Sequence, residues 1–354
     1  MTLISLFSGE DGFAFLGDSL LTSNSKDYFD HPLPTTPLPN ENNKVVGRDF
    51  YVSGMARKIS PITDELCIAA SGNISEIGQI IEKLVKISRP GLYGTKDLGD
   101  LYMESGLAES KFSSVLASSG DGQAYFIPTK MHMQEHGKGR RVFVGGTGQS
   151  SFNKNYLKFF RKKKTNIIKT INNSISMCAT MMIAQDRTGY GLDKRYGGFF
   201  ETVFSGENKF EPVTNILYIF RNWWWDKNDK YNYLAKEIYH TSGIFHNVDA
   251  MLYATHVGDN IFVIRWLSGD IRVSIIPSLT QHRFVPLSRF FNNIDHVVET
   301  LLHGSGKYAF QVFPSKEQHS NNYSLKIDDV NCAAYIPNKL SEEMIKQIGM
   351  FPKI

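Results

Sequence analysis

Apolar and polar residues alternate over residues 2–7 at the start of the chain, and a second apolar run covers residues 13–16. A period of two is typical of a strand with one buried face, and the glycines and acidic residues at 9–12 are typical of a turn. These segments therefore predict a β-hairpin at the N-terminus. Residues 24–56 follow as a polar insertion with four prolines, which favours loop or edge structure. Residues 58–70 predict two short strands around a turn.

The apolar period changes at Ile74. From there, apolar side chains recur at helical spacing until Pro90 ends the pattern. Beyond this helix the pattern predicts a hairpin, a strand, two helices and two strands, at residues 112–127, 142–144, 150–161, 165–185, 199–204 and 215–220. Groups of strands followed by groups of helices predict an α+β fold, in which two packed sheets carry helices on their outer faces as a four-layer αββα sandwich.

The pattern changes again beyond this sandwich. Strand-like runs occur at 260–266, 271–276 and 308–313, and an apolar stretch near 293–303 predicts a helix. The sequence therefore predicts two regions. The first, residues 2–225, forms the sandwich, and the second, residues 226–354, is a C-terminal extension of α/β structure.

The composition indicates a chain that can bury a large core, and its net charge does not favour binding to nucleic acid. Of its 354 residues, 42% are hydrophobic, and the formal net charge is only +4. The basic runs at 140–141 and 161–164 are local, which favours solvated faces over a phosphate-binding surface. The N-terminus lacks the pattern of a signal peptide, and no apolar window of about 18 residues occurs. We therefore expect a cytoplasmic protein that binds neither nucleic acid nor membrane.

The cysteines and histidines predict neither a disulfide framework nor a metal site. Cys67, Cys178 and Cys332 are widely spaced, and the ten histidines form no His-Glu-x-x-His pattern. Cys67 and Cys178 lie in apolar runs, where a buried structural thiol is expected. No cofactor is expected.

Thr2 is the first candidate for chemistry. An N-terminal threonine combines a hydroxyl nucleophile with an α-amine whose reference pKa, about 7.7–8.0, suits a general base near neutral pH. The amine is free only if Met1 is removed. We expect this removal, because threonine is small enough for the aminopeptidase that trims initiator methionines.

Three further segments follow Thr2 along the chain. Asp18 lies sixteen residues after Thr2, at the end of the second apolar run. Lys58 lies within the segment Arg-Lys-Ile-Ser-Pro-Ile, and Gly72 follows fourteen residues later at the end of Ala-Ala-Ser-Gly.

Two more motifs complete the set. Val-Gly-Gly-Thr-Gly at 144–148 precedes a predicted helix, and Asp-Lys-Arg-Tyr-Gly-Gly begins at Asp193. In this order and with these spacings, the segments resemble the motifs of proteasome β subunits and their bacterial relatives, which belong to the N-terminal-nucleophile (Ntn) hydrolase superfamily. The resemblance covers about residues 2–220.

The resemblance implies a role for each matched residue. Thr2 would attack the carbonyl of an amide and use its own amine to move the proton. Lys58, held by Asp18, would lower the pKa of the Thr2 hydroxyl by its positive charge. The Gly72 N–H would receive the developing oxyanion, and Asp193 would orient the N-terminus.

The chain departs from the family at two hydroxyl positions. Tyr196 stands where the family has the serine of its Asp-x-x-Ser motif, and a tyrosine hydroxyl reaches further. The second family serine, in the glycine-rich turn, falls at Gln149 or Ser150. The resemblance also implies that Ala70 and Ile74 line the first specificity pocket, which indicates apolar substrate side chains.

The leading hypothesis is therefore a threonine-type peptidase that acts on peptides or proteins and, as in the family, assembles as a homo-oligomer. Two alternatives remain open. One is an amidase that acts on a small molecule, and the other is a non-catalytic Ntn-fold scaffold or interaction protein. The C-terminal extension would cap the site, alter assembly or recruit a partner.

Overall fold

The chain forms two units; both contain sheets, and all the described helices lie in the first. The first unit holds the residues up to Val213, together with Gly258–Ile261 and a segment that starts at Ile275; the second holds the remainder. The computed structural model describes residues 2–8, 12–25, 33–35, 48–135, 141–155, 166–189, 191–206, 209–223, 248–267, 270–279, 294–303, 309–312, 324–327 and 332–335.

A six-stranded antiparallel sheet carries the N-terminus of the first unit. Its strand order is β12-β11-β2-β1-β10-β9. The strands are β1 Leu3–Ser8, β2 Phe13–Asp18, β9 His132–Glu135, β10 Arg141–Gly146, β11 Phe200–Ser205 and β12 Phe210–Pro212. The predicted hairpin β1–β2 is confirmed. Because β1 lies between β2 and β10, the start of the chain is held on both edges, with Ile4 opposite both Gly17 and Gly145.

A four-stranded antiparallel sheet packs against the first. Its order is β5-β6-β7-β8, with β5 Ile59–Pro61, β6 Leu66–Ser71, β7 Ser113–Gly120 and β8 Gln123–Thr129. These strands confirm the predictions for residues 58–70 and 112–127. The side chains between the two sheets form one apolar cluster: Ile4, Leu6, Phe13, Phe15, Phe143, Val203 and Phe210 from the larger sheet, and Ile59, Cys67, Ala69, Val115 and Ala117 from the smaller. This cluster fixes which face of each strand is turned inward.

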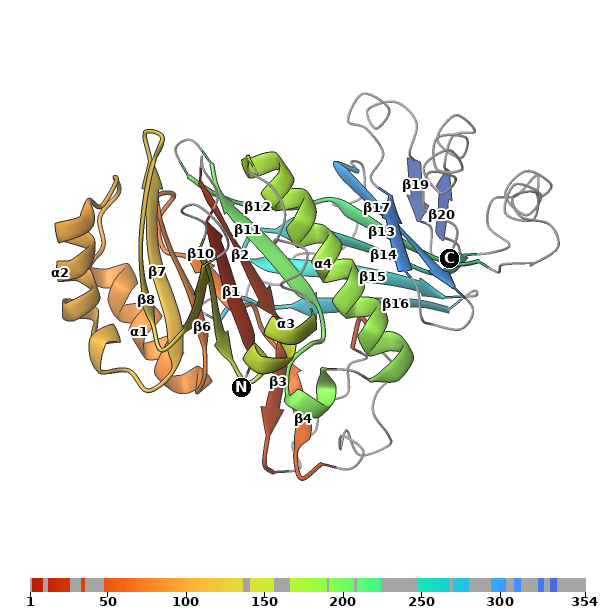
Figure 1. Cartoon of the computed structure of the whole chain (residues 1–354), viewed down its shortest axis with the longest axis horizontal. Helices are drawn as coiled ribbons and strands as arrows, with labels where there is room; N and C mark the ends of the chain where they lie inside the picture. Colours follow the sequence, from red (N-terminus) through yellow and green to blue (C-terminus); the bar gives the residue numbers. More distant parts are fainter. Residues whose placement is uncertain are drawn as a thin grey trace. The chain divides into compact units, whose positions relative to one another are not determined.

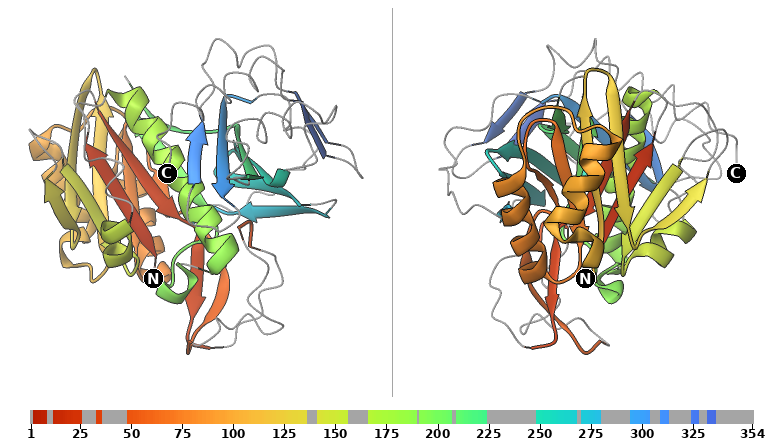
Figure 2. Two further views of the ribbon diagram at one scale, coloured as in Figure 1. Left: turned by 45° about the vertical axis from the view of Figure 1, so that its right-hand side comes forward. Right: turned by 90° about the vertical axis from the view of Figure 1, so that its left-hand side faces the viewer.

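Two helices cover the outer face of the four-stranded sheet. These are α1 Ile74–Ile87, which was predicted, and α2 Thr95–Ser105, which was not. The Asn73 side chain caps α1 by accepting hydrogen bonds from the N–H groups of Ser75 and Glu76. Both helices bury their apolar stripe against the sheet, through Ile77, Ile81, Leu84, Leu98 and Leu101. The right-hand view of Figure 2 shows these helices in front of the sheets.

Helices also cover the six-stranded sheet. The helix α3 Gln149–Asn155 packs Phe152 against Phe7 of β1, with the ring centroids 6.2 Å apart. The long helix α4 Ile167–Thr188 lies along β2 and β11. Figure 1 shows α1 and α2 on one side of the paired sheets and α4 on the other. The described parts of both helices agree with the sequence prediction. The first unit is thus a mixed α and β structure with helices on both outer faces.

The predicted insertion at 24–56 lies mostly outside the described residues. Its described end forms β4 Tyr51–Met55, which pairs with β3 Leu20–Ser23 as a separate two-stranded ribbon.

The second unit is built on a six-stranded sheet of order β16-β15-β14-β13-β17-β18. The strands are β13 Ile216–Trp223, β14 Val248–Val257, β15 Asn260–Leu267, β16 Asp270–Ile276, β17 His296–His303 and β18 Ala309–Val312. A further pair is β19 Ser324–Ile327 and β20 Cys332–Tyr335. The predicted strands at 260–266, 271–276 and 308–313 are confirmed. The strand predicted at 215–220 lies in this sheet, as β13, and not with the first region.

The helix predicted near residues 293–303 is wrong, because this segment is the strand β17. It pairs in parallel with β13 and antiparallel with β18, so it is a central strand. The consecutive residues Val297 and Val298 are both buried, as expected for a strand covered on both faces. The apolar spacing of this segment suits a helix and a doubly buried strand equally well, and its β-branched residues favour the strand.

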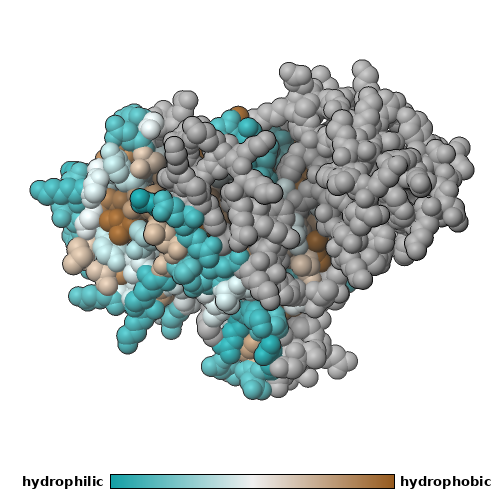
Figure 3. All heavy atoms as spheres, in the orientation of Figure 1, coloured by the Kyte–Doolittle hydropathy of each residue, from teal (hydrophilic) through white to brown (hydrophobic). Residues whose placement is uncertain are grey.

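The described residues on the face drawn in Figure 3 are mainly hydrophilic. Figure 3 shows hydrophilic side chains around small apolar patches on one face. The exposed large apolar side chains among the described residues are Val85, Met103, Met133, Ile168 and Val273. No helix within the described ranges has both the length and the apolar character that a membrane span requires.

Candidate active site

Thr2 immediately precedes β1 and is almost completely buried, with 1% of its surface exposed. Side chains alternate along a strand, so Thr2 shares a face with Ile4 and Leu6, which pack between the two sheets. The Thr2 hydroxyl therefore faces the four-stranded sheet. It has no hydrogen-bond partner.

Asp18, at the end of β2, connects the start of β1 to the loop before β11. One carboxylate oxygen accepts the Leu3 N–H at 3.0 Å, and the other accepts the Gly197 N–H at 2.7 Å. Burial raises the pKa of Asp18 to about 6, against the opposing effect of the Lys58 charge and of the two backbone hydrogen bonds. Asp18 thus holds the backbone next to Thr2 in place.

Lys58 immediately precedes β5 and is 2% exposed. Its ammonium group has no hydrogen-bond partner. Burial lowers the pKa of Lys58 to about 8, although the charges of Asp18 and Glu201 oppose this effect. Gly17 makes room for the lysine, because a Cβ at this position would lie 3.3 Å from the Lys58 Cβ. The fold brings Lys58 close enough to Asp18 for their charges to interact.

Glu201 on β11 holds the residues on either side of Lys58. Its carboxylate accepts the Arg57 Nε–H at 3.0 Å and the Ile59 N–H at 3.3 Å. Arg57 and Glu201 are both buried. The sequence analysis missed this residue, although a single acidic side chain within the apolar run Phe-Phe-Glu-Thr-Val-Phe is a signal that a buried partner exists.

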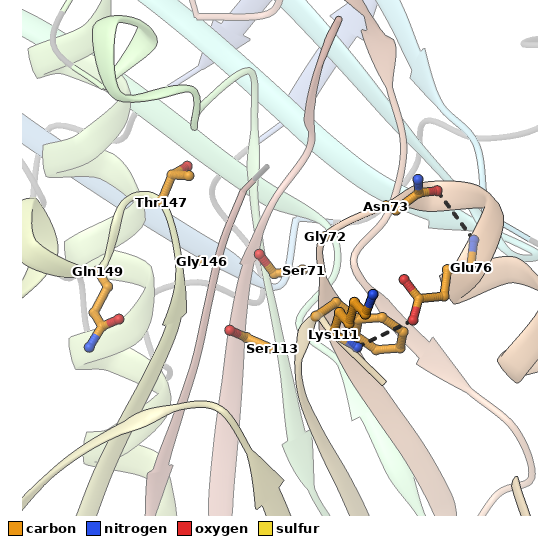
Figure 4. A pocket seen from close by; sticks show the side chains of 10 residues that line it. Ser71, Gly72, Asn73, Glu76, Lys111, Ser113, Gly146, Thr147 and Gln149 are labelled. Atoms are coloured by element: carbon orange, nitrogen blue, oxygen red, sulfur yellow. Dashed lines mark hydrogen bonds between the residues drawn. The ribbon is translucent and has the colours of Figure 1, made fainter. Parts of the chain in front are cut away.

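Gly72 follows β6 and precedes the capping residue of α1. A Cβ at Gly72 would overlap the Phe112 side chain, so only glycine fits. A pocket of about 330 Å³ opens beside it. The pocket is lined by Ser71, Gly72, Asn73, Glu76, Lys111, Phe112, Ser113, Gly146, Thr147 and Gln149 (Figure 4).

Ala70 and Ile74 are not among the residues that line this pocket. Ala70 is buried in the cluster between the four-stranded sheet and its helices, and Ile74 is the first residue of α1. The side chains that do border the pocket are mainly polar.

The glycine-rich turn after β10 packs against both Thr2 and Tyr196. Gly146 has a φ of +93°, and a Cβ there would overlap the Thr2 carbonyl. A Cβ on Gly148 would lie 2.7 Å from the Tyr196 ring. The Tyr196 hydroxyl is 3.1 Å from the hydroxyl of Ser151.

The serine that meets Tyr196 is therefore Ser151 and not Gln149 or Ser150. Gln149 lines the pocket, and Ser150 is exposed. Ser151 lies on the first turn of α3, so the helix places it toward the buried ring. Sequence reasoning missed Ser151 because the apolar pattern does not fix the first residue of this helix, and therefore does not fix which side chain faces Tyr196.

Asp193 lies in a short 3₁₀ turn, Leu192–Lys194, and pairs with cations. Its carboxylate is 2.9 Å from the Lys194 ammonium and 3.3 Å from the Arg48 guanidinium. Partial burial raises the pKa of Asp193, but the hydrogen bonds and charges of these groups outweigh this and leave the pKa below its ordinary value. Asp193 makes no hydrogen bond to Thr2, and the backbone next to Thr2 is held by Asp18 instead.

The described residues contain no group of three or more His, Cys, Asp or Glu side chains that could hold a metal ion. Cys67 and Cys178 are buried free thiols, as expected from the sequence. Burial raises the pKa of both thiols, that of Cys178 to about 12. A scan against models of known protein families finds no match, and a search of curated proteins finds no significant relative.

Proposed function

We propose that the protein is an Ntn hydrolase of the proteasome β-subunit kind, which cleaves amide bonds with Thr2 as the nucleophile after Met1 is removed. One observation carries the proposal. The Thr2 hydroxyl and the Lys58 ammonium are both buried without a hydrogen-bond partner, and Asp18 interacts with the charge of Lys58 and with the Leu3 N–H next to Thr2. An unpartnered buried polar group costs about 1–3 kcal/mol, and a charged one costs more. A role in binding or catalysis is one explanation for a buried polar group that has no partner.

The arrangement of the first unit supports the same proposal. Two packed sheets with helices on both outer faces agree with the αββα sandwich that the family resemblance implies. The central position of β1 also suits the role, because a nucleophile at the chain terminus needs a rigid support.

The proposed reaction uses groups that are already near one another. The Thr2 hydroxyl attacks the substrate carbonyl, and the free α-amine of Thr2 takes the hydroxyl proton and passes it to the leaving amine. The charge of Lys58 favours the alkoxide form of Thr2. The Gly72 N–H donates to the oxyanion of the tetrahedral intermediate. Water, activated by the same amine, then hydrolyses the ester that joins the acyl group to Thr2.

Hydrolysis of short fluorogenic peptide amides tests the proposal. The variant Thr2→Ala is expected to lose turnover by a factor of about 1,000 or more, because it lacks the nucleophile. Thr95→Ala, which changes an exposed threonine at the start of α2, is the matched control and is expected to leave turnover unchanged. Equal turnover in the wild type and Thr2→Ala would exclude Thr2 as the nucleophile.

The alternative of a non-catalytic scaffold is favoured by one observation. Asp193, which the resemblance assigns to the N-terminus, is paired with Arg48 and Lys194. A scaffold predicts no turnover of any amide and no covalent reaction at Thr2. The small-molecule amidase predicts turnover of simple amides that exceeds turnover of peptides.

A further inference from the structure

Ser71, the last residue of β6, is a buried hydroxyl that the proposed reaction does not use. It is 4% exposed, and its oxygen has no hydrogen-bond partner. Ala69, two residues earlier on the strand, faces the six-stranded sheet, so Ser71 faces it as well. Ser71 also lines the pocket beside Gly72. Figure 4 shows its oxygen pointing to the side of the pocket formed by Gly146.

The Ser71 hydroxyl borders the same small space as the backbone of Thr2. A Cβ on Gly146 would lie 2.5 Å from the Ser71 oxygen and would overlap the Thr2 carbonyl. Gly146 therefore keeps open the space in which the hydroxyl and the start of β1 meet. A side chain at position 146 cannot fill it, since any residue but glycine there would collide with Thr2.

The neighbouring serines differ from Ser71 in one of two respects. Ser113 lies directly opposite Ser71 across β6 and β7, and it also lines the pocket. Its hydroxyl, however, donates to the Lys130 carbonyl at 2.9 Å. Ser5, Ser60 and Ser114 are buried without partners but do not line the pocket. Among the serines that line the pocket, Ser71 is the one with a free hydroxyl.

We propose that Ser71 is a further catalytic residue, whose hydroxyl donates a second hydrogen bond to the oxyanion formed when Thr2 attacks the substrate. This inference rests on the proposed function. The Gly72 N–H is the first donor, and Ser71 is its immediate neighbour in the chain. A hydrogen-bond donor that has no other partner and already points to the place where negative charge develops needs no rearrangement during the reaction. Ser71 keeps its proton throughout, so the step changes no covalent bond of this side chain.

The variant Ser71→Ala tests the inference, and Ser75→Ala, which changes an exposed serine of α1 outside the pocket lining, is its matched control. Loss of one oxyanion donor typically lowers kcat by a factor of about 100 to 1,000, so a fall of about 100-fold with little change in KM is expected for Ser71→Ala. Ser75→Ala is expected to stay close to the wild type. A structural role would instead lower the midpoint of thermal unfolding. Ser71→Ala is expected to leave that midpoint unchanged, because its hydroxyl has no partner to lose.

Two inhibitors separate this role from the proposed function. A capped tripeptide aldehyde forms an adduct that carries an oxyanion, whereas the matching vinyl sulfone reacts without forming one. Ser71→Ala is expected to weaken aldehyde binding at least tenfold while the vinyl sulfone still labels Thr2. If both inhibitors act equally on Ser71→Ala and the wild type, the role of Ser71 is excluded and the proposed function stands. If neither inhibitor reacts with the wild type at Thr2, the proposed function fails, and the role of Ser71 fails with it.

Discussion

At the scale of single residues, the account depends most on the charge of Lys58. The variant Lys58→Met keeps most of the side-chain volume and removes the charge. Turnover is expected to fall by a factor of about 100 or more, because the hydroxyl of Thr2 loses the cation that favours its ionised form. Lys83→Met, on the exposed face of α1, is the matched control. Circular dichroism verifies that both variants are folded, and normal turnover in a folded Lys58→Met protein would remove Lys58 from the mechanism.

The pKa of Lys58 also predicts how turnover depends on pH. Catalysis needs Lys58 charged, and burial lowers its pKa to about 8, so kcat/KM is expected to fall as the pH rises through about 8. Catalysis also needs the Thr2 amine neutral, and the reference pKa of an α-amine is about 7.7–8.0. The profile is therefore a narrow bell with its maximum near pH 8. A rate that stays constant into alkaline solution would contradict the assignment.

The same shift has a consequence for stability. Because the pKa of Lys58 is lowered on folding, the unfolded chain binds more protons than the native protein between about pH 8 and the ordinary value of 10.5. Lys58 therefore destabilises the native protein most below about pH 8, and this destabilisation decreases as the pH rises toward 10.5. Urea unfolding at several pH values is expected to show this decrease in the wild type relative to Lys58→Met. If the stability of the wild type relative to Lys58→Met instead fell as the pH rises, folding would stabilise the charged form of Lys58, and the account would be contradicted.

At the scale of elements, Glu201 ties β11 to the start of β5. The variant Glu201→Gln leaves the Arg57 cation buried without a counter-charge, which typically costs about 3–5 kcal/mol of unfolding free energy. Glu211→Gln on β12 removes a partner of the exposed Lys209 and is expected to cost about 1 kcal/mol or less. Urea unfolding measures both. Equal losses in the two variants would show that the buried pair does not hold the strands together.

The elements also show what the sequence can predict. The hairpins β1–β2 and β7–β8 and the helix α1 were predicted correctly, because each has a clear apolar period with turn or cap residues at its ends. The helix α2 was missed, since it buries only Leu98, Leu101 and Ser105 and contains a glycine. The resemblance implies that Asp18 lies beside Lys58, and their charges do interact in the fold. Glu201, Ser151 and Ser71 were missed because their roles depend on which side chains meet between strands and helices, and spacing along one chain does not encode this.

At the scale of the whole molecule, the family resemblance predicts a homo-oligomer with contacts through the helical faces. The described residues offer exposed apolar side chains on these faces, Val85 on α1, Met103 on α2 and Ile168 on α4. The double variant Val85→Glu/Met103→Glu is expected to shift the mass measured by light scattering toward the monomer at micromolar concentration, because a buried charge weakens an apolar contact. Val273→Glu on β16 is the control. A wild type that is strictly monomeric would contradict the assembly.

The central claim is that Thr2 is the nucleophile and that its α-amine must be free. Intact-mass spectrometry of the purified, active protein after treatment with a peptide vinyl sulfone tests both parts in one measurement. The account predicts a chain that lacks Met1 and carries a single adduct, which peptide mapping assigns to Thr2 and which Thr2→Ala does not form. With Met1 attached, the Thr2 nitrogen is an amide that cannot take up the hydroxyl proton. Full turnover from protein whose mass still includes Met1, or an adduct elsewhere in the chain, would contradict the account.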